Sequence, residues 1–321
     1  MRATEVKKKS KVLKSLLHDA ILDSVRFVTE KCETLGTKPQ EPDFIAALCL
    51  KFTPTLFNCL NAVFPRKKFS VTGIFCHQKP VVDIGLGKNP ELGDILFLYL
   101  YKDKMGNRLM NSLLFQAKIS KSLISKVSTG DQHQLELYTK WPQFTYKSAG
   151  TLNRQTRDVL PKTINDGAQY LMIDDHPFYG LSGHPGTFPM GCEVPAKILN
   201  LDNRLSDELV DFIKFKSGRI VENDPTSTKD DWTRMIWDLL EIAKEVSSKR
   251  KNIGISEFPR ITTAESDGLC FFQADAKSIL SDFHEKLPNM DNSFQNRSFI
   301  DEENRACSVI LIESDEENEG L

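Results

Sequence analysis

The chain has 321 residues, of which 40% are hydrophobic and 27% are charged, and its formal net charge is −2. These values are typical of a soluble globular protein with one large α/β domain and additions or two small domains. The charge gives no overall sign of nucleic-acid binding, although a local basic surface is compatible with it.

Two helices are predicted at the N-terminal end. Apolar residues recur every three or four positions from about Glu5 to Leu35, and Gly36 then gives a stop signal. The second helix opens at Glu41, because Pro42 suits a first helical turn and acids favour its positive end. We expect Pro54 to interrupt this helix.

Strands follow the helices. An apolar pattern between Lys68 and Gln78 predicts the first strand, and two longer apolar runs come after it. Asp94 opens one run, while Gln116 and Lys118 close the other. Because Gly106-Asn107 is a turn signal between these two runs, we expect them to pair as an antiparallel hairpin.

The rest of the chain alternates between helices, strands and polar segments. In chain order the prediction is a polar region over 120–130, a helix over 131–140, a core strand over 166–174, a surface loop over 176–189, helices over 205–215 and 232–246, a short strand over 270–272, a strand over 308–312 and a disordered acidic tail over 313–321. No apolar run approaches the roughly 20 residues of a membrane span, and no signal-peptide pattern follows the basic start. We therefore expect a cytoplasmic protein without a membrane partner.

The seven cysteines are scattered singly, and none forms a CxxC pair. Several lie inside apolar runs, which favours buried free thiols in a reducing compartment. A zinc site would need clustered ligands, and the sequence has no such cluster of cysteines.

The predicted hairpin would bring three functional groups together. Residues i and i+2 of a strand share a face, so Gln116 and Lys118 project together, and Asp94 comes beside them if the strands pair. A carboxylate, an amide oxygen and an ammonium suit a divalent metal held against a phosphate. The open alternatives are an acid that caps a turn and a strand end that emerges into solvent.

This pattern resembles the PD-(D/E)xK superfamily of restriction-endonuclease-like nucleases, in its QxK variant. The order of elements matches the family core over about residues 40–175: a helix with an acid, the two hairpin strands, a helix and a further strand. Gln134 and Tyr138 also resemble the Gln-x-x-x-Tyr helix motif of RecB-type nucleases. The sequence departs from the usual pattern in two places, since Gly93 stands where a proline is common and Gln116 replaces an acid.

The resemblance implies an α/β fold with a mixed central β-sheet flanked by helices. It implies an N-terminal helix with a basic start over 1–40, a nuclease-like core over 41–175, a C-terminal extension packed on the core over 176–312 and the acidic tail over 313–321. It also implies an Mg²⁺-dependent nuclease acting on DNA, with Mn²⁺ as a substitute, of the kind that serves in microbial defence against phage or plasmids. No ATPase signature is present, so activation or translocation would come from a protein partner, and homo-oligomerisation stays open.

The resemblance also assigns roles to residues. Asp94, Gln116 and Glu41 would hold the metal, and Lys118 would assist the attacking water. Gln134 and Tyr138 would support the lysine or bind the substrate strand. Asp43 or Glu30 stays open in place of Glu41. The rival interpretation is a catalytically weak or inactive protein of this fold that binds nucleic acid or a partner protein, because the second acid is missing.

Overall fold

The computed structural model describes residues 3–76, 80–85, 87–120, 122, 124–174, 189–200, 203–226, 228–245, 261–266 and 305–316. Its helices are α1 (Ala3–Thr34), α2 (Glu41–Ala47), the π-helix η1 (Leu48–Phe52), α3 (Thr53–Val63), α4 (Gln132–Lys140), the 3₁₀-helix η2 (Gly150–Leu152), α5 (Leu205–Ile213) and α6 (Asp231–Glu245). Its strands are β1 (Lys68–Ile74), β2 (Val81–Asp83), β3 (Ile95–Lys102), β4 (Arg108–Ser120), β5 (Ile124–Lys126), β6 (Phe144–Ser148), β7 (Thr156–Arg157), β8 (Ala168–Asp174), β9 (Met190–Glu193), β10 (Ile198–Asn200), β11 (Asn203–Arg204), β12 (Arg219–Val221), β13 (Ile261–Glu265) and β14 (Ser308–Asp315). Apart from Pro189, the loop predicted over 176–189 lies outside the described residues, as does the strand predicted over 270–272.

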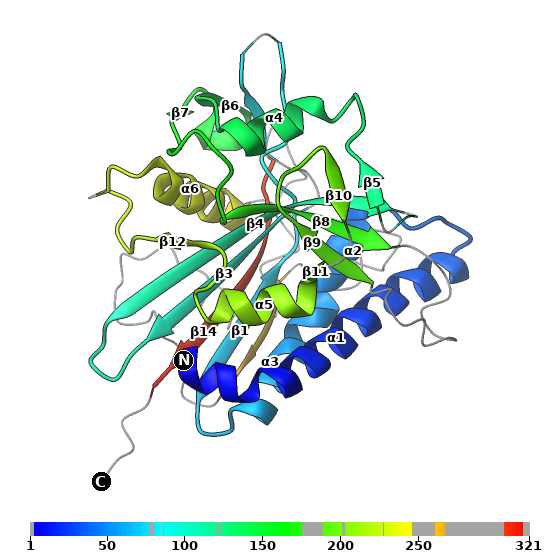
Figure 1. Cartoon of the computed structure of the whole chain (residues 1–321), viewed down its shortest axis with the longest axis vertical. Coiled ribbons are helices and arrows are strands. Elements are labelled where there is room, and N and C mark those ends of the chain that lie inside the picture. Colours follow the sequence, from blue (N-terminus) through cyan, green and yellow to red (C-terminus); the bar gives the residue numbers. More distant parts are fainter. Residues whose placement is uncertain are drawn as a thin grey trace, which may run out of the picture.

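A mixed sheet of nine strands forms the centre of the fold (Figure 1). Its order is β11-β9-β8-β4-β3-β14-β1-β13, with β12 paired to β4. The predicted hairpin is confirmed, because β3 and β4 are antiparallel neighbours with Ile95 opposite Phe115. β8 runs parallel to β4, and β14 runs parallel to β3. The predicted α/β class with a mixed sheet flanked by helices is thus confirmed.

Helices cover both faces of this sheet (Figure 1). One face packs against α1, α2, α3 and α5, and the other packs against α4, α6 and the small sheet of β2, β6 and β7. Side chains alternate between the two cores, so Phe97 of β3 joins the first while Leu96 and Leu98 join the second. Because both faces are covered, β3 reads as an almost continuous apolar run.

The segment from α2 to α3 corrects one prediction. Pro54 does not end the helix, because it falls in the first turn of α3, directly after the π-helical turn η1. The backbone stays in the right-handed α region through Phe52 and Thr53, so the helix continues across the proline after the π-helical turn. The whole segment Glu41–Val63 is long and apolar enough to cross a membrane by length and composition, but 67% of its most apolar window is buried inside the fold. That burial is the property of a core helix.

The C-terminal strand corrects two further predictions. β14 lies between β1 and β3, so it is a central strand of the sheet and not an extension packed on a core that ends near residue 175. The strand also continues to Asp315, and Glu313 is fully buried opposite Ser70. The acidic tail predicted from residue 313 therefore begins as ordered sheet, because pairing with strands on both sides satisfies its backbone groups.

Smaller features agree with the sequence in part. Six of the seven cysteines lie among the described residues, and all six are buried free thiols, as predicted. The polar region predicted over 120–130 contains a short strand, β5, which pairs with β10.

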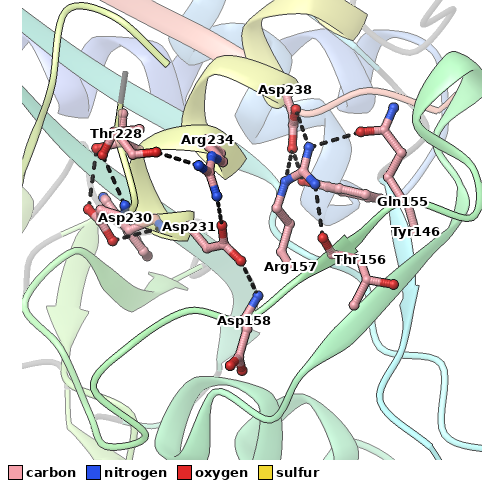
Figure 2. Close-up of polar contacts among 12 residues, drawn as sticks. Tyr146, Gln155, Thr156, Arg157, Asp158, Thr228, Asp230, Asp231, Arg234 and Asp238 are labelled. Carbon is pink, nitrogen blue, oxygen red and sulfur yellow. Dashed lines mark hydrogen bonds and ion pairs between the residues drawn. The ribbon is translucent and has the colours of Figure 1, made fainter. Parts of the chain in front are cut away.

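A polar network fastens α6 to β6 and β7 (Figure 2). Arg157 donates two hydrogen bonds to Asp238, from Nε to Oδ2 over 2.7 Å and from Nη2 to Oδ1 over 2.9 Å. The Tyr146 hydroxyl donates to the same carboxylate over 3.0 Å, and the Asp158 N–H donates to Asp231 over 2.6 Å. The paired Arg157 and Asp238 side chains are each 14% exposed. This network therefore fixes the small sheet against α6, on the sheet face that also carries α4.

Candidate functional site

Asp94 is held in the middle of the sheet by its backbone. It directly precedes β3, and its N–H donates to the Phe115 carbonyl over 2.8 Å. On the other side, the Ser308 N–H donates to the Asp94 carbonyl over 3.1 Å. Because Ile95 lies opposite Phe115, this ladder places Asp94 opposite Gln116 on the adjacent strand.

The Asp94 and Gln116 side chains are in direct contact. Gln116 Nε2 donates to Asp94 Oδ2 over 2.6 Å, and the Ala117 N–H donates to the same oxygen over 2.7 Å. Asp94 is only 2% exposed and Gln116 only 1%. Burying a carboxylate is costly unless donors compensate for the lost water, and these two N–H groups provide that compensation.

The turn before Asp94 explains why glycine stands at position 93. A Cβ there would lie 2.6 Å from Leu114 Cδ1 and 3.2 Å from the Tyr138 hydroxyl. The same hydroxyl donates to the Leu92 carbonyl over 2.8 Å. Tyr138 therefore braces the turn that carries Asp94. Burial, with a smaller contribution from the Asp94 charge, raises the pKa of Tyr138 well above its ordinary value of 10.0.

Lys118 lies two residues beyond Gln116 and forms an ion pair with Asp131, which directly precedes α4. Lys118 Nζ lies 3.0 Å from Asp131 Oδ1, and the side chains are 26% and 35% exposed. Ser128 Oγ donates to the other Asp131 oxygen over 2.7 Å. Burial would raise the pKa of Asp131, but the hydrogen bonds from Ser128 and Lys118 outweigh it and lower that pKa from 3.8. The ammonium is thus tethered at the more exposed end of the site.

Glu41 reaches the same end of β4 from the opposite layer. Its Oε1 accepts a hydrogen bond from the Ile119 N–H over 3.2 Å, so this carboxylate contacts the residue that follows Lys118. Asp43 has a different task, since its Oδ2 accepts the Gln40 N–H over 2.8 Å and caps α2. Glu41 is therefore better placed than Asp43 to be the helix acid. Glu30 is an exposed residue of α1.

The predicted helix motif divides into two different positions. Tyr138 is buried, and its hydroxyl donates to the Leu92 carbonyl, so in this structure it supports the turn before Asp94. Its role toward the lysine or the substrate strand stays a prediction. Gln134 is 4% exposed, and its Nε2 has no hydrogen-bond partner among the residues that the structure describes. Because i and i+4 share a helix face, both side chains point from α4 toward the sheet.

Sequence reasoning missed Asp131, Ser128 and Tyr170. The pattern Ser128-x-x-Asp131 before a helix is a capping signal, and it could have marked Asp131 as an ordered carboxylate. Tyr170 gave no such signal, because an aromatic residue inside an apolar strand predicts only burial. Its place beside Gln116 follows from the parallel pairing of β4 with β8, which the sequence does not state.

The site fits a divalent cation in part. The Gln116 Oε1 is buried and has no hydrogen-bond partner in the described part of the chain, which suits an oxygen that serves as a ligand. A half-turn of the Gln116 amide would exchange Nε2 for Oε1 beside the Asp94 carboxylate. Within the described ranges no group of three or more His, Cys, Asp or Glu side chains could hold a metal, so Asp94 and Gln116 would bind a cation only together with water or a ligand.

Comparison with known proteins gives no relative. No family model matches the chain, no curated protein matches it, and no solved structure matches its fold.

Proposed function

We propose that this protein is a metal-dependent nuclease that hydrolyses phosphodiester bonds in DNA. The observation that carries the proposal is the contact between the Asp94 carboxylate and the Gln116 amide at the end of the β3–β4 hairpin. Lys118 shares the face of Gln116, and the Glu41 carboxylate bonds the next residue along β4. We refer to Asp94, Gln116 and Lys118 below as the candidate centre.

In this proposal, Asp94 and Gln116 hold Mg²⁺ or Mn²⁺, with Glu41 as a further carboxylate. The bound metal would polarise the phosphate and lower the pKa of a water molecule. Lys118 would orient that water or offset the charge that develops on the phosphate. Asp131 would keep the ammonium in place, and Tyr138 would fix the turn before Asp94. The proposal includes a cytoplasmic location, a role in microbial defence and an activating or translocating protein partner, each of which rests on the resemblance to PD-(D/E)xK nucleases.

A second candidate function has its own observation. Asp94 and Gln116 are almost completely buried, and two N–H donors already bond the carboxylate. A centre closed in this way favours a protein that binds nucleic acid or a protein partner without cutting. Such a protein would bind DNA equally well with and without Mg²⁺.

The test is cleavage of plasmid and linear DNA in Mg²⁺ or Mn²⁺ by the natural chain and by Lys118→Ala. We expect the variant to lose activity by about 10²- to 10⁴-fold, the usual contribution of a group that assists proton transfer. Its stability should hardly change, because a partly exposed ion pair contributes about 1 kcal/mol or less. Lys140→Ala is the matched control, since Lys140 is 68% exposed and forms its ion pair with Glu136 of the same helix.

Three outcomes separate the candidates. Loss of cutting in Lys118→Ala alone supports the nuclease and its centre. If Lys118→Ala cuts DNA as fast as Lys140→Ala and the natural chain do, the centre has been assigned to the wrong residues. If the natural chain does not cut DNA and its affinity for DNA is the same with and without Mg²⁺, the result favours a protein that binds without cutting.

A further inference from the structure

Beside the candidate centre lies a buried tyrosine that neither the motif nor the resemblance includes. Tyr170 of β8 is the register partner of Gln116 on the adjacent parallel strand. Register partners in neighbouring strands point to the same face and lie about 4.8 Å apart. The Tyr170 side chain is fully buried, and its ring centre is 6.0 Å from that of Tyr138. Tyr170 therefore lies beside Gln116, on the sheet face that Tyr138 of α4 covers.

The Tyr170 hydroxyl has no hydrogen-bond partner among the described residues, although a buried hydroxyl nearly always has one. The buried atoms on this face that share that property include the Gln116 Oε1 and the Gln134 Nε2, and also the Trp141 Nε1. Gln134 comes from the buried side of α4, and its neighbour Leu135 packs in the same apolar cluster as Tyr170. The unsatisfied atoms of Tyr170, Gln116 and Gln134 come from β8, β4 and α4 on the same side of the sheet, where a bound group would complete their hydrogen bonds.

The chemistry of these atoms indicates what that group is. The Gln116 oxygen can only accept, which suits a cation, whereas the Gln134 amide nitrogen can only donate and the Tyr170 hydroxyl can donate as well. Two donors beside a carboxylate would suit an anion only if a cation or an ammonium were also present. The cation would bind beside the Asp94 carboxylate. The ammonium is that of Lys118, which lies two residues beyond Gln116 on the same face of β4, opposite Met172 of β8. A phosphate oxygen with its metal ion satisfies donors and acceptors together.

We propose that Tyr170 is a phosphate-binding residue of the candidate centre, whose hydroxyl donates a hydrogen bond to a non-bridging oxygen of the nucleic-acid backbone, with the Gln134 amide as a second donor. This inference rests on the proposed function and adds to it a residue that contacts the substrate. Burial, and then the nearby charge of Asp131, raises the pKa of Tyr170, so the phenol keeps its proton and remains a donor.

The test compares two tyrosine-to-phenylalanine variants of the whole chain. Tyr170→Phe removes only the unsatisfied hydroxyl, so its melting temperature should equal or exceed that of the natural chain. Tyr146→Phe is the matched control, because Tyr146 is also buried but its hydroxyl bonds Asp238 over 3.0 Å, away from the centre. That variant should melt at a lower temperature.

Binding of a short fluorescein-labelled DNA oligonucleotide in Ca²⁺ is then measured by fluorescence anisotropy. Tyr170→Phe should bind about 10- to 100-fold more weakly, the effect of losing a hydrogen bond to a charged oxygen. Tyr146→Phe should bind as the natural chain does. Unchanged binding by Tyr170→Phe overturns the inference, and so does a natural chain that binds no DNA. A lower melting temperature with unchanged binding would mean that Tyr170 bonds a structural water or another part of the chain.

Cleavage in Mg²⁺ is measured separately, so that the two proposals can fail independently. A natural chain that binds DNA but does not cut it refutes the nuclease, while weaker binding by Tyr170→Phe still supports the phosphate contact. A natural chain that cuts DNA, with Tyr170→Phe equal to it in affinity and rate, refutes the role of Tyr170 alone.

Discussion

Replacement of Asp94 by asparagine tests the centre of the proposed site most directly. The change keeps the size of the side chain and removes its charge. An asparagine oxygen in the position of Oδ2 can still accept from Gln116 Nε2 and from the Ala117 N–H, which now lie 2.6 Å and 2.7 Å from it. The fold should therefore survive.

The expected loss in the free energy of unfolding can be worked out from those two hydrogen bonds. A hydrogen bond to a charged group contributes about 1.5–3 kcal/mol, against about 0.5–1.5 kcal/mol for a neutral pair. The difference is about 1–1.5 kcal/mol per bond, so the two bonds give an upper limit of about 3 kcal/mol for the loss in the free energy of unfolding. The true loss is smaller, because the amide costs less to bury than the carboxylate.

Cation binding should change much more than the fold. A ligand at 100 times its Kd stabilises a folded protein by about 2.7 kcal/mol. At the Mg²⁺ concentration that stabilises the natural chain by this amount, Mg²⁺ should hardly change the free energy of unfolding of Asp94→Asn. The assay is denaturant unfolding with and without Mg²⁺, with Asp238→Asn as the control, because Asp238 is a partly buried, hydrogen-bonded carboxylate outside the centre.

Two results would refute this reasoning. If Asp94→Asn kept the full Mg²⁺-induced stabilisation, the carboxylate would not be a metal ligand. If Asp238→Asn lost it as well, the effect would come from general destabilisation and not from the centre.

Two further predictions concern the residues around Asp94 and Lys118. Gly93→Ala should lower the free energy of unfolding by about 1–3 kcal/mol, because the added Cβ would lie 2.6 Å from Leu114 Cδ1; urea unfolding measures this, and an unchanged midpoint would contradict the close packing. The lowered pKa of Asp131 means that the folded state holds this proton less tightly than the unfolded state. Its stabilising contribution is therefore complete above the unfolded pKa of about 3.8 and is lost as the pH falls through the lower folded value. Unfolding measured between about pH 5 and pH 3 should show a smaller acid-induced loss for Asp131→Asn than for the natural chain, and equal losses would disprove the shift.

The local pattern of the sequence was sufficient for the elements around the site. The hairpin follows from two apolar runs separated by Gly106-Asn107, and the helix after Lys118 follows from its apolar spacing and its end before Pro142. The contact between Asp94 and Gln116 also follows from strand pairing, because the side-chain period of a strand fixes which residues share a face. These predictions needed only interactions between neighbours in the chain or across one turn.

Local sequence patterns did not predict the contacts between segments that are far apart in the chain. Nothing local predicts that the C-terminal strand enters the sheet between β1 and β3, which buries Glu313 and makes an expected tail part of the core. The same is true of Tyr170, which reaches Gln116 only because β8 pairs in parallel with β4.

The sequence by itself therefore determined the hairpin, the helix that follows it and the contact between Asp94 and Gln116. The tertiary structure alone decided what surrounds that centre: the tether of Lys118 to Asp131, the brace of Tyr138 on the Asp94 turn and the unsatisfied hydroxyl of Tyr170. The physical reason is that propensity and periodicity act over a few residues, whereas strand order and helix packing depend on the burial of apolar surface contributed by the whole chain.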